Sequence, residues 1–173
     1  MRYLLLIPLL GLLVGCQTIT PQQCSIADWY QVGYEDGTKG RDSLYVSNYS
    51  KPCSSANIIP NRVQWERGRQ EGFKRFCTVP VAHSEGLSGN KFSSICPVDS
   101  THTARYNAWY QGYQIFELKR QVRNNEGEYS FYLREYERTS GKEREASWIR
   151  MNDARTKANR ARYELSRLGI YVE

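Results

Sequence analysis

One spacing of aromatic residues and glycines occurs three times in the chain and limits how it can fold. In each stretch an aromatic residue precedes a glycine by three positions, and in two of them a second glycine follows four positions later. The aromatic residues are Tyr30, Trp65 and Trp109, and the glycines are Gly33, Gly37, Gly68, Gly72 and Gly112. On an α-helix these positions share one face. Because glycine destabilises a helix interior by about 1 kcal/mol relative to alanine, we expect close approach of another backbone or ring to compensate.

We therefore predict three related helices that pack against one another, with these five glycines as the helix-packing residues. The flanking segments, such as Glu66-Arg67, are too charged for a membrane helix with the same small-residue spacing. In the third stretch Phe116 occupies the position of the second glycine. A ligand-binding groove formed by the same faces is the alternative interpretation.

The last part of the chain has the hydrophobic pattern of an antiparallel helical hairpin. Seam residues recur in steps of four and three, as in a coiled coil. The first arm has Leu118, Val122, Asn125, Tyr129, Tyr132 and Tyr136, and the second has Met151, Ala154, Ala158, Ala161, Leu165 and Leu168. Gly141 should break the helix between them, and Ser140 with Glu143 can form a capping box for the second arm. A break at Asn124-Asn125-Glu126-Gly127 is the alternative turn.

Short helices joined by long loops are predicted for the first part of the chain. Ser25 offers a cap for a helix over residues 25–39, with Gly40 as its stop, and Asn61 caps a helix that reaches about Cys77. A third helix starts near Ser100 or Thr101. The polar residues 41–60 and the proline- and glycine-containing residues 78–97 are predicted loops, which need tethering in a compact domain. The predicted fold class is mainly α, with disulfide-tied short helices and long loops followed by a C-terminal antiparallel helical hairpin.

Four cysteines lie at or beside these two predicted loops, namely Cys24, Cys53, Cys77 and Cys96. An even number in an oxidising compartment indicates two disulfides, and four cysteines allow three pairings. We favour Cys24–Cys53 and Cys77–Cys96, because each bond would close a loop with little regular structure. A metal site is the weaker alternative, since no two cysteines have the spacing of a short ligand knuckle.

The N-terminus has the pattern of a bacterial lipoprotein signal peptide. Arg2 precedes an apolar run that ends at Val14 and is shorter than the roughly 20 residues of a spanning helix. The tetrapeptide Leu13-Val14-Gly15-Cys16 is similar to a lipobox, which implies cleavage before Cys16 and lipid on that cysteine. Three acyl chains would exceed the two that suffice for stable anchoring. The residue after the cysteine is Gln17 and not aspartate, and by resemblance to the sorting rule of enteric-type bacteria this favours transfer to the outer membrane.

The expected organisation follows from these segments. It consists of a signal peptide at 1–15, a lipidated tether at 16–23, a cysteine- and glycine-patterned helical domain at 24–116 and a charged helical hairpin at 117–173.

The chain resembles a domain-of-unknown-function family of small bacterial envelope lipoproteins. The resemblance covers about residues 24–116, and the hairpin lies beyond it. Phe116 and the tryptophans at 65 and 109 are mild departures from the family pattern. The matching elements are Cys24, Asp28-Trp29-Tyr30, Gly33-Tyr34-Glu35-Asp36-Gly37, the segments 65–72 and 109–113, Phe76-Cys77, Gly86, Gly89, Phe92 and Cys96-Pro97. The resemblance implies the architecture and brings no established activity.

Motifs of catalysis are missing from the sequence. It has no nucleotide-binding glycine loop with a lysine and no serine elbow. His83 and His102 are expected to be surface histidines rather than general bases. Asp36 and Arg69 are expected to pair across the glycine interface, as a structural contact. We therefore predict no catalytic residue, no metal and no cofactor.

The charge of the chain, formally +6, bears on its partners. An exported protein rarely meets nucleic acid, so anionic envelope polymers are the charged partners to consider. Two basic rows border the second hairpin arm, and their candidate contact residues are Arg155, Arg160, Arg162 and Arg167. The expected function is that of a non-enzymatic structural or interaction lipoprotein of the cell envelope. It would be held to the outer membrane by the lipid on Cys16 and face the periplasm or the cell surface. The alternative is an inhibitor or binding module for a hydrolase or an envelope polymer such as peptidoglycan or lipopolysaccharide.

Overall fold

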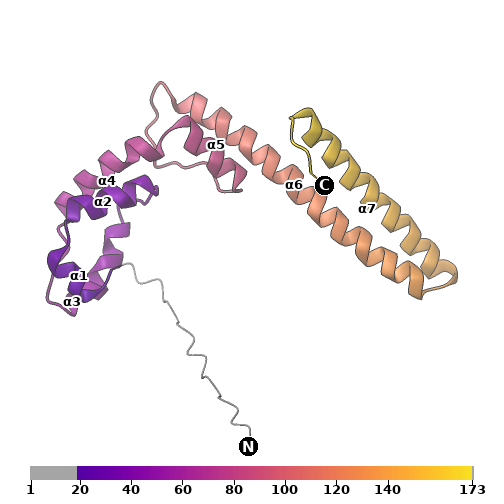
Figure 1. Cartoon of the computed structure of the whole chain (residues 1–173), viewed down its shortest axis with the longest axis horizontal. Helices are drawn as coiled ribbons and strands as arrows, with labels where there is room; N and C mark the ends of the chain where they lie inside the picture. The colour runs from indigo at the N-terminus through magenta and orange to yellow at the C-terminus, as the bar shows by residue number, and fades with distance from the viewer. Residues whose placement is uncertain (1–18, 173) are drawn as a thin grey trace, which may run out of the picture.

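The computed structural model describes residues 19–172, and within this range all regular structure is helical. The mainly α fold class is therefore confirmed. Figure 1 shows an extended molecule in which two groups of short helices are followed by a long hairpin. The elements are α1 Pro21–Ile26, α2 Trp29–Thr38, the 3₁₀ helix η1 Tyr45–Tyr49, α3 Ser50–Ser54, α4 Arg62–Phe76, α5 Val79–Leu87, α6 His102–Arg138 and α7 Gly141–Arg167. The predictions for the signal peptide, Cys16 and Gln17 lie outside the described residues.

The first group of helices is built around the pair α2 and α4, which lie side by side. Its core contains Trp29, Val46, Tyr49 and Trp65, together with the Cys24–Cys53 disulfide. The disulfide joins α1 to α3, so it ties the segment before α2 to the segment that follows it. The core is small, and the crosslink compensates for that by restricting the unfolded chain.

The predicted helix over residues 25–39 is wrong at its start, because the structure has two helices there. Ser25 belongs to α1, and the chain is extended at Ala27. Asp28 begins α2, since its carboxylate accepts hydrogen bonds from the backbone N–H groups of Tyr30 and Gln31. The predicted stop is confirmed, with Gly40 in the left-handed region at φ 68° just beyond α2.

Two predicted loops and the predicted tether contain more structure than expected. Residues 41–60 hold η1 and α3, and residues 78–97 hold α5. Thr78 caps α5 by accepting from the N–H of Val81, and Pro80 lies in the first turn, where its missing N–H is harmless. The tether, expected over residues 16–23, is already folded at Ile19, which is buried, and Thr20 caps α1 with a capping box.

The second group pairs α5 with the N-terminal part of α6. The Cys77–Cys96 disulfide connects the end of α4 to the segment before α6, so it closes the excursion that contains α5. Both predicted cysteine pairings are confirmed.

The hairpin consists of the remainder of α6 and α7, which pack along their length. The chain turns at Thr139 and Ser140, as predicted. The alternative break at 124–127 is wrong, because α6 runs through it as one helix of 37 residues. Gly141 has φ 57°, but the predicted capping box at Ser140 is absent, since its side chain makes no capping hydrogen bond. The predicted domain boundary between residues 116 and 117 falls inside α6.

Small residues line the interior of the hairpin. Ala154, Ala158, Ala161 and Leu165 of α7 are buried against α6, where Val122 is buried. Ser147 continues this row toward the turn and is also buried, although we did not predict it. Leu168 was predicted in the seam but is 52% exposed, because α7 ends at Arg167 and the chain turns away.

Candidate functional site: glycine contacts, charged clusters and an aromatic groove

The predicted glycines lie where helix backbones touch. A Cβ added to Gly33 would be 1.9 Å from the carbonyl oxygen of Trp65, and one added to Gly68 would be 1.9 Å from that of Tyr30. Gly37 and Gly72 make equivalent contacts along the same interface. The α2–α4 pair is therefore locked by reciprocal glycine contacts, and these four residues have a packing role.

Gly112 belongs to a different helix pair, which corrects the prediction of three mutually packed helices. A Cβ at Gly112 would meet the carbonyl oxygen of His83 in α5, and one at Gly86 would meet that of Trp109 in α6. Gly86 was placed in a loop by its neighbouring prolines and glycines, so its helical partner role was missed.

The two helix pairs repeat one arrangement. Gly40 and Gly89 both have positive φ and both face a phenylalanine ring, Phe76 and Phe116 respectively. Each phenylalanine follows a packed glycine by four residues, Gly72 in α4 and Gly112 in α6. Phe116 therefore corresponds to Phe76 of the first helix pair and does not stand in place of a glycine. The α2–α4 and α5–α6 pairs have the form of an internal duplication.

Asp36 and Arg69 do not pair across the α2–α4 interface as predicted. Asp36 is buried, and its Oδ2 accepts from the hydroxyl of Tyr49 at 2.7 Å and from the indole N–H of Trp65 at 2.8 Å. Arg69 instead donates to Glu66, one helical turn away, and to the carbonyl of Arg41 at 3.2 Å. Both charged residues thus find partners that the spacing of glycines could not indicate.

The Asp36 cluster is a structural contact that joins α2, α4 and η1. Burial, together with the hydrogen bond to Asp36, raises the pKa of the Tyr49 hydroxyl above its ordinary range. The bond from Arg69 lowers the pKa of the Glu66 carboxyl. Buried groups with satisfied hydrogen bonds of this kind define how elements meet.

The basic rows of α7 are partly neutralised by neighbouring carboxylates. Arg162 forms an ion pair with Glu126 of α6, and Arg167 forms one with Glu164 at 3.5 Å. Arg155 donates to the side chain of Asn152 at 2.8 Å. The arginines predicted as an anionic-polymer contact therefore present less net positive charge than their number implies.

An aromatic surface runs along the first three turns of α6. Tyr106, Trp109, Tyr110 and Tyr113 are spaced so that they share one side of the helix, and Phe92 packs on Tyr106 and Trp109 from the preceding segment. The rings of Tyr106 and Tyr110 are nearly parallel, at 8° and 6.4 Å, and those of Trp109 and Tyr113 are stacked at 20° and 5.2 Å. The indole N–H of Trp109 donates to the carbonyl of Asn90 at 2.8 Å, which fixes this ring.

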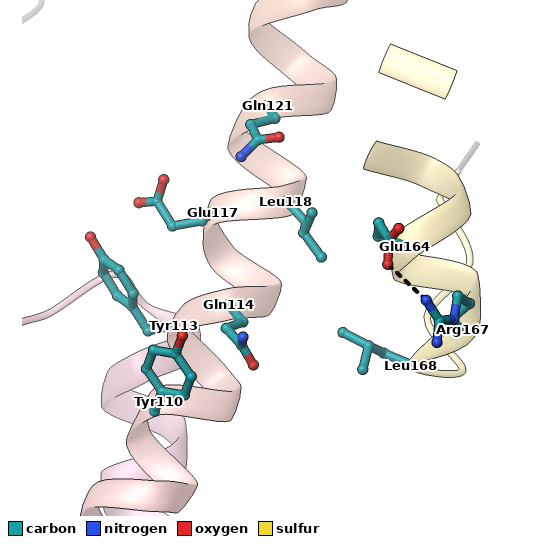
Figure 2. A pocket seen from close by; sticks show the side chains of 9 residues that line it. All are labelled: Tyr110, Tyr113, Gln114, Glu117, Leu118, Gln121, Glu164, Arg167 and Leu168. Atoms are coloured by element: carbon teal, nitrogen blue, oxygen red, sulfur yellow. Dashed lines mark ion pairs between the residues drawn. The ribbon is translucent and has the colours of Figure 1, made fainter. Parts of the chain in front are cut away.

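This surface continues into an open groove of about 530 Å³ between α6 and the end of α7 (Figure 2). Leu118 of α6 and Leu168 extend toward one another across it, and the Glu164–Arg167 ion pair lies on the α7 side. The other lining residues are Tyr110, Tyr113, Gln114, Glu117 and Gln121. We refer to this site as the aromatic groove.

Sequence reasoning missed the aromatic groove, although part of its signal is in the sequence. Aromatic residues at 106, 109, 110 and 113 have the spacing of one helix face. The contribution of residues 164–168 depends on where α7 ends relative to α6, which only the hairpin packing decides.

Residues 19–172 contain no group of three histidine, cysteine, aspartate or glutamate side chains arranged to hold a metal ion. His102 contacts the ring of Phe92, and His83 lies in the α5–α6 interface through its carbonyl. Over the same range, no helix has the length and apolar character required to cross a membrane.

The fold and site define a class of disulfide-tied helical proteins with glycine-packed helix pairs. Residues 28–114 match the family described as "Protein of unknown function (DUF2799)", and the chain belongs to this family. It is 32% identical over 110 residues to the "Uncharacterized protein YfiL" of Escherichia coli (strain K12), which covers 61% of this chain and 85% of that protein. No solved structure shows a significant match. The family match ends inside α6, so α7 and the α7 side of the aromatic groove lie outside it.

Proposed function

We propose that the protein is a non-enzymatic interaction protein of the bacterial envelope, held to the outer membrane by lipid on Cys16, and that the α6–α7 hairpin is its partner-binding arm. The observation that carries this proposal is the continuity of α6. Its 37 residues correspond to a rod of about 55 Å, with α5 packed on its first part and α7 on its second. A single helix shared in this way holds the hairpin away from the α2–α4 pair (Figure 1).

The position of Ile19 supports anchoring through a short connection. Ile19 packs in the core of the first helix group, and three residues of chain cannot separate it from Cys16 by more than about 11 Å. A lipid on Cys16 would therefore keep the α1–α4 group close to the bilayer. The hairpin, at the other end of the molecule, would be presented to partners in the envelope.

The proposed lipid attachment and membrane localisation are tested by metabolic labelling with a fatty acid. The unchanged protein should incorporate label and fractionate with outer membranes, whereas Cys16→Ala should remain unlabelled and uncleaved. Labelling of Cys16→Ala would contradict the proposal. A Gln17→Asp variant provides the matched control for sorting, since it should keep the label and change the membrane in which the protein is found.

The partner-binding arm is tested by photo-crosslinking in intact cells. A photoreactive residue is placed at Phe131 or Trp148 on the hairpin, which are 49% and 52% exposed, or at Ile59 before α4, which is 88% exposed. We expect a discrete crosslinked product from the hairpin positions and not from Ile59. Equal products from all three positions would contradict a role for the hairpin.

A polymer-binding cationic strip is the less favoured candidate. Arg162 and Arg167 form ion pairs with carboxylates, and Lys157 forms one with Asp153. The geometry of the arm favours a contact based on shape and aromatic surface over one based on net charge.

A further inference from the structure

We infer that the aromatic groove is a binding site for an uncharged pyranose oligosaccharide. The inference deepens the proposed function, because a protein displayed in the envelope is surrounded by glycans.

Aromatic residues at and beside the groove are partly exposed to solvent. Tyr110, which lines the groove, is 48% exposed, and Tyr106, one helical turn before it, is 44% exposed. The rings of Tyr106 and Tyr110 are nearly parallel, and Phe92 packs edge to face against Tyr106, so the cluster holds the Tyr110 ring beside the groove. Pyranose rings present a flat face of C–H groups, and such faces stack on aromatic rings.

The polar residues of the groove match the hydroxyl groups of a sugar. Gln114 and Gln121 each carry a donor and an acceptor, and Glu117 and Glu164 carry acceptors. Sugar hydroxyls both donate and accept, so a mixed set of this kind can satisfy them from several directions. A purely apolar ligand would leave these side chains without partners.

Glu117 provides a second observation that points to a ligand. Its Oε2 accepts from Arg120 at 2.5 Å, while its Oε1 is buried and has no hydrogen-bond partner among residues 19–172. A buried carboxylate oxygen without a donor is unfavourable. A hydroxyl group bound in the groove would supply that donor once the Glu117 side chain turns its Oε1 toward the groove.

The charge balance argues for an uncharged ligand. Arg167 is paired with Glu164, and Arg120 is paired with Glu117, so the groove has no free positive charge for a phosphate or carboxylate. The two ion pairs leave the groove close to neutral, in contrast to the basic rows predicted from the sequence. The groove volume of about 530 Å³ is within the range of small-ligand sites and fits a few sugar residues.

Calorimetric titration of the full-length protein tests the inference, in a detergent without a sugar headgroup. The probes are a trisaccharide of N-acetylglucosamine, a trisaccharide of glucose, and lipopolysaccharide. We expect binding of at least one trisaccharide that changes little with salt. The two trisaccharides distinguish a peptidoglycan-type source from a glucan-type source. Absence of binding to both at millimolar concentration, or salt-sensitive binding to lipopolysaccharide alone, would overturn the inference.

Ring variants then locate the site. Tyr110→Ala should weaken binding by about tenfold, since it removes an exposed ring that lines the groove. Tyr110→Phe keeps the ring and should bind nearly as the unchanged protein does. Tyr163→Ala is the matched control, because Tyr163 is 63% exposed on α7 and does not line the groove. Equal loss in Tyr163→Ala and Tyr110→Ala would overturn the assignment.

Glu117→Gln keeps the shape of the side chain and should weaken binding, because its single amide oxygen would accept from Arg120 and leave an N–H donor in place of the free acceptor. Thermal melting of each variant without sugar shows whether the fold is intact. The binding assay is independent of lipid on Cys16, so its failure and the failure of the anchoring proposal are separate results.

Discussion

The glycine contacts between α2 and α4 predict an unusual response to alanine. In an exposed helix, replacing glycine by alanine stabilises the protein by about 1 kcal/mol. At Gly68 the new Cβ would lie 1.9 Å from the carbonyl oxygen of Tyr30 and 2.8 Å from the backbone nitrogen of Tyr34. Both are backbone atoms of a packed helix, so no side-chain movement can relieve the contact. The helices must separate instead.

The size of the effect follows from this geometry. Separation by about 1 Å opens the interface along its length, and overpacking of this kind typically costs up to about 3 kcal/mol. The gain in helix propensity offsets about 1 kcal/mol of this loss. We therefore expect Gly68→Ala to lower the free energy of unfolding by about 2 kcal/mol, which for a protein of this size lowers the melting temperature by about 4–8 °C.

The matched control is Gly127→Ala in the middle of α6. A Cβ there would have nothing within 4 Å, so only the propensity gain remains, and we expect stabilisation by about 1 kcal/mol. Urea denaturation and thermal melting under non-reducing conditions measure both variants. The opposite signs are the decisive result. If Gly68→Ala were as stable as Gly127→Ala, the reasoning from backbone approach would be refuted.

Three further predictions concern a crosslink, a buried cluster and the hairpin. Replacing Cys77 and Cys96 together by serine removes a crosslink over 19 residues and should lower the free energy of unfolding by about 3 kcal/mol, measured by urea denaturation against the unchanged protein with and without reductant. The pKa of the Tyr49 hydroxyl is raised in the folded state, so its neutral form stabilises the protein fully below pH 10, and this stability is lost as the pH rises beyond the unfolded value. Tyr49→Phe should therefore have a lower free energy of unfolding than the unchanged protein at pH 8, and the difference should narrow above pH 10. A difference that does not change with pH would contradict this reasoning. Ala158→Leu should destabilise the hairpin by about 1–3 kcal/mol, because Ala158 is 3% exposed where α6 and α7 pack closely. Amide hydrogen exchange should become faster in α7 and stay unchanged in α2. Exchange that rises equally in both helices would contradict this prediction.

Local patterns in the sequence predicted most of the helical architecture. The step of four and three residues identified the hairpin, and Asn61 marked the start of α4. The two disulfides followed from the positions of the cysteines relative to the loops. These features depend on helix periodicity and on chain neighbours, so they are encoded within short segments. The misplaced start of α2 shows the limit, because Asp28 competes with Ser25 as a cap and only the folded chain shows which is used.

Long-range packing decided the rest. The glycine spacing marked contact faces, but it did not say that Gly112 packs on α5 while Gly68 packs on α2. Asp36 was recognised as an interface residue, yet its partners came from Trp65 and from Tyr49 in a segment predicted as a loop. In each case the reason is that periodicity fixes which residues share a face, whereas the identity of the opposing face depends on tertiary contacts.

The aromatic groove shows this division most clearly. The sequence by itself determined that Tyr106, Tyr110 and Tyr113 lie on one side of a helix, because their spacing follows the helical repeat. Only the tertiary structure placed residues 164–168 opposite them, since that depends on the turn at Thr139 and on the alanine seam that sets how closely α7 lies against α6. It also decided that Arg162 is paired rather than free, because Glu126 of α6 lies within its reach only once the hairpin has formed, whereas Arg167 pairs with Glu164 three residues away within α7.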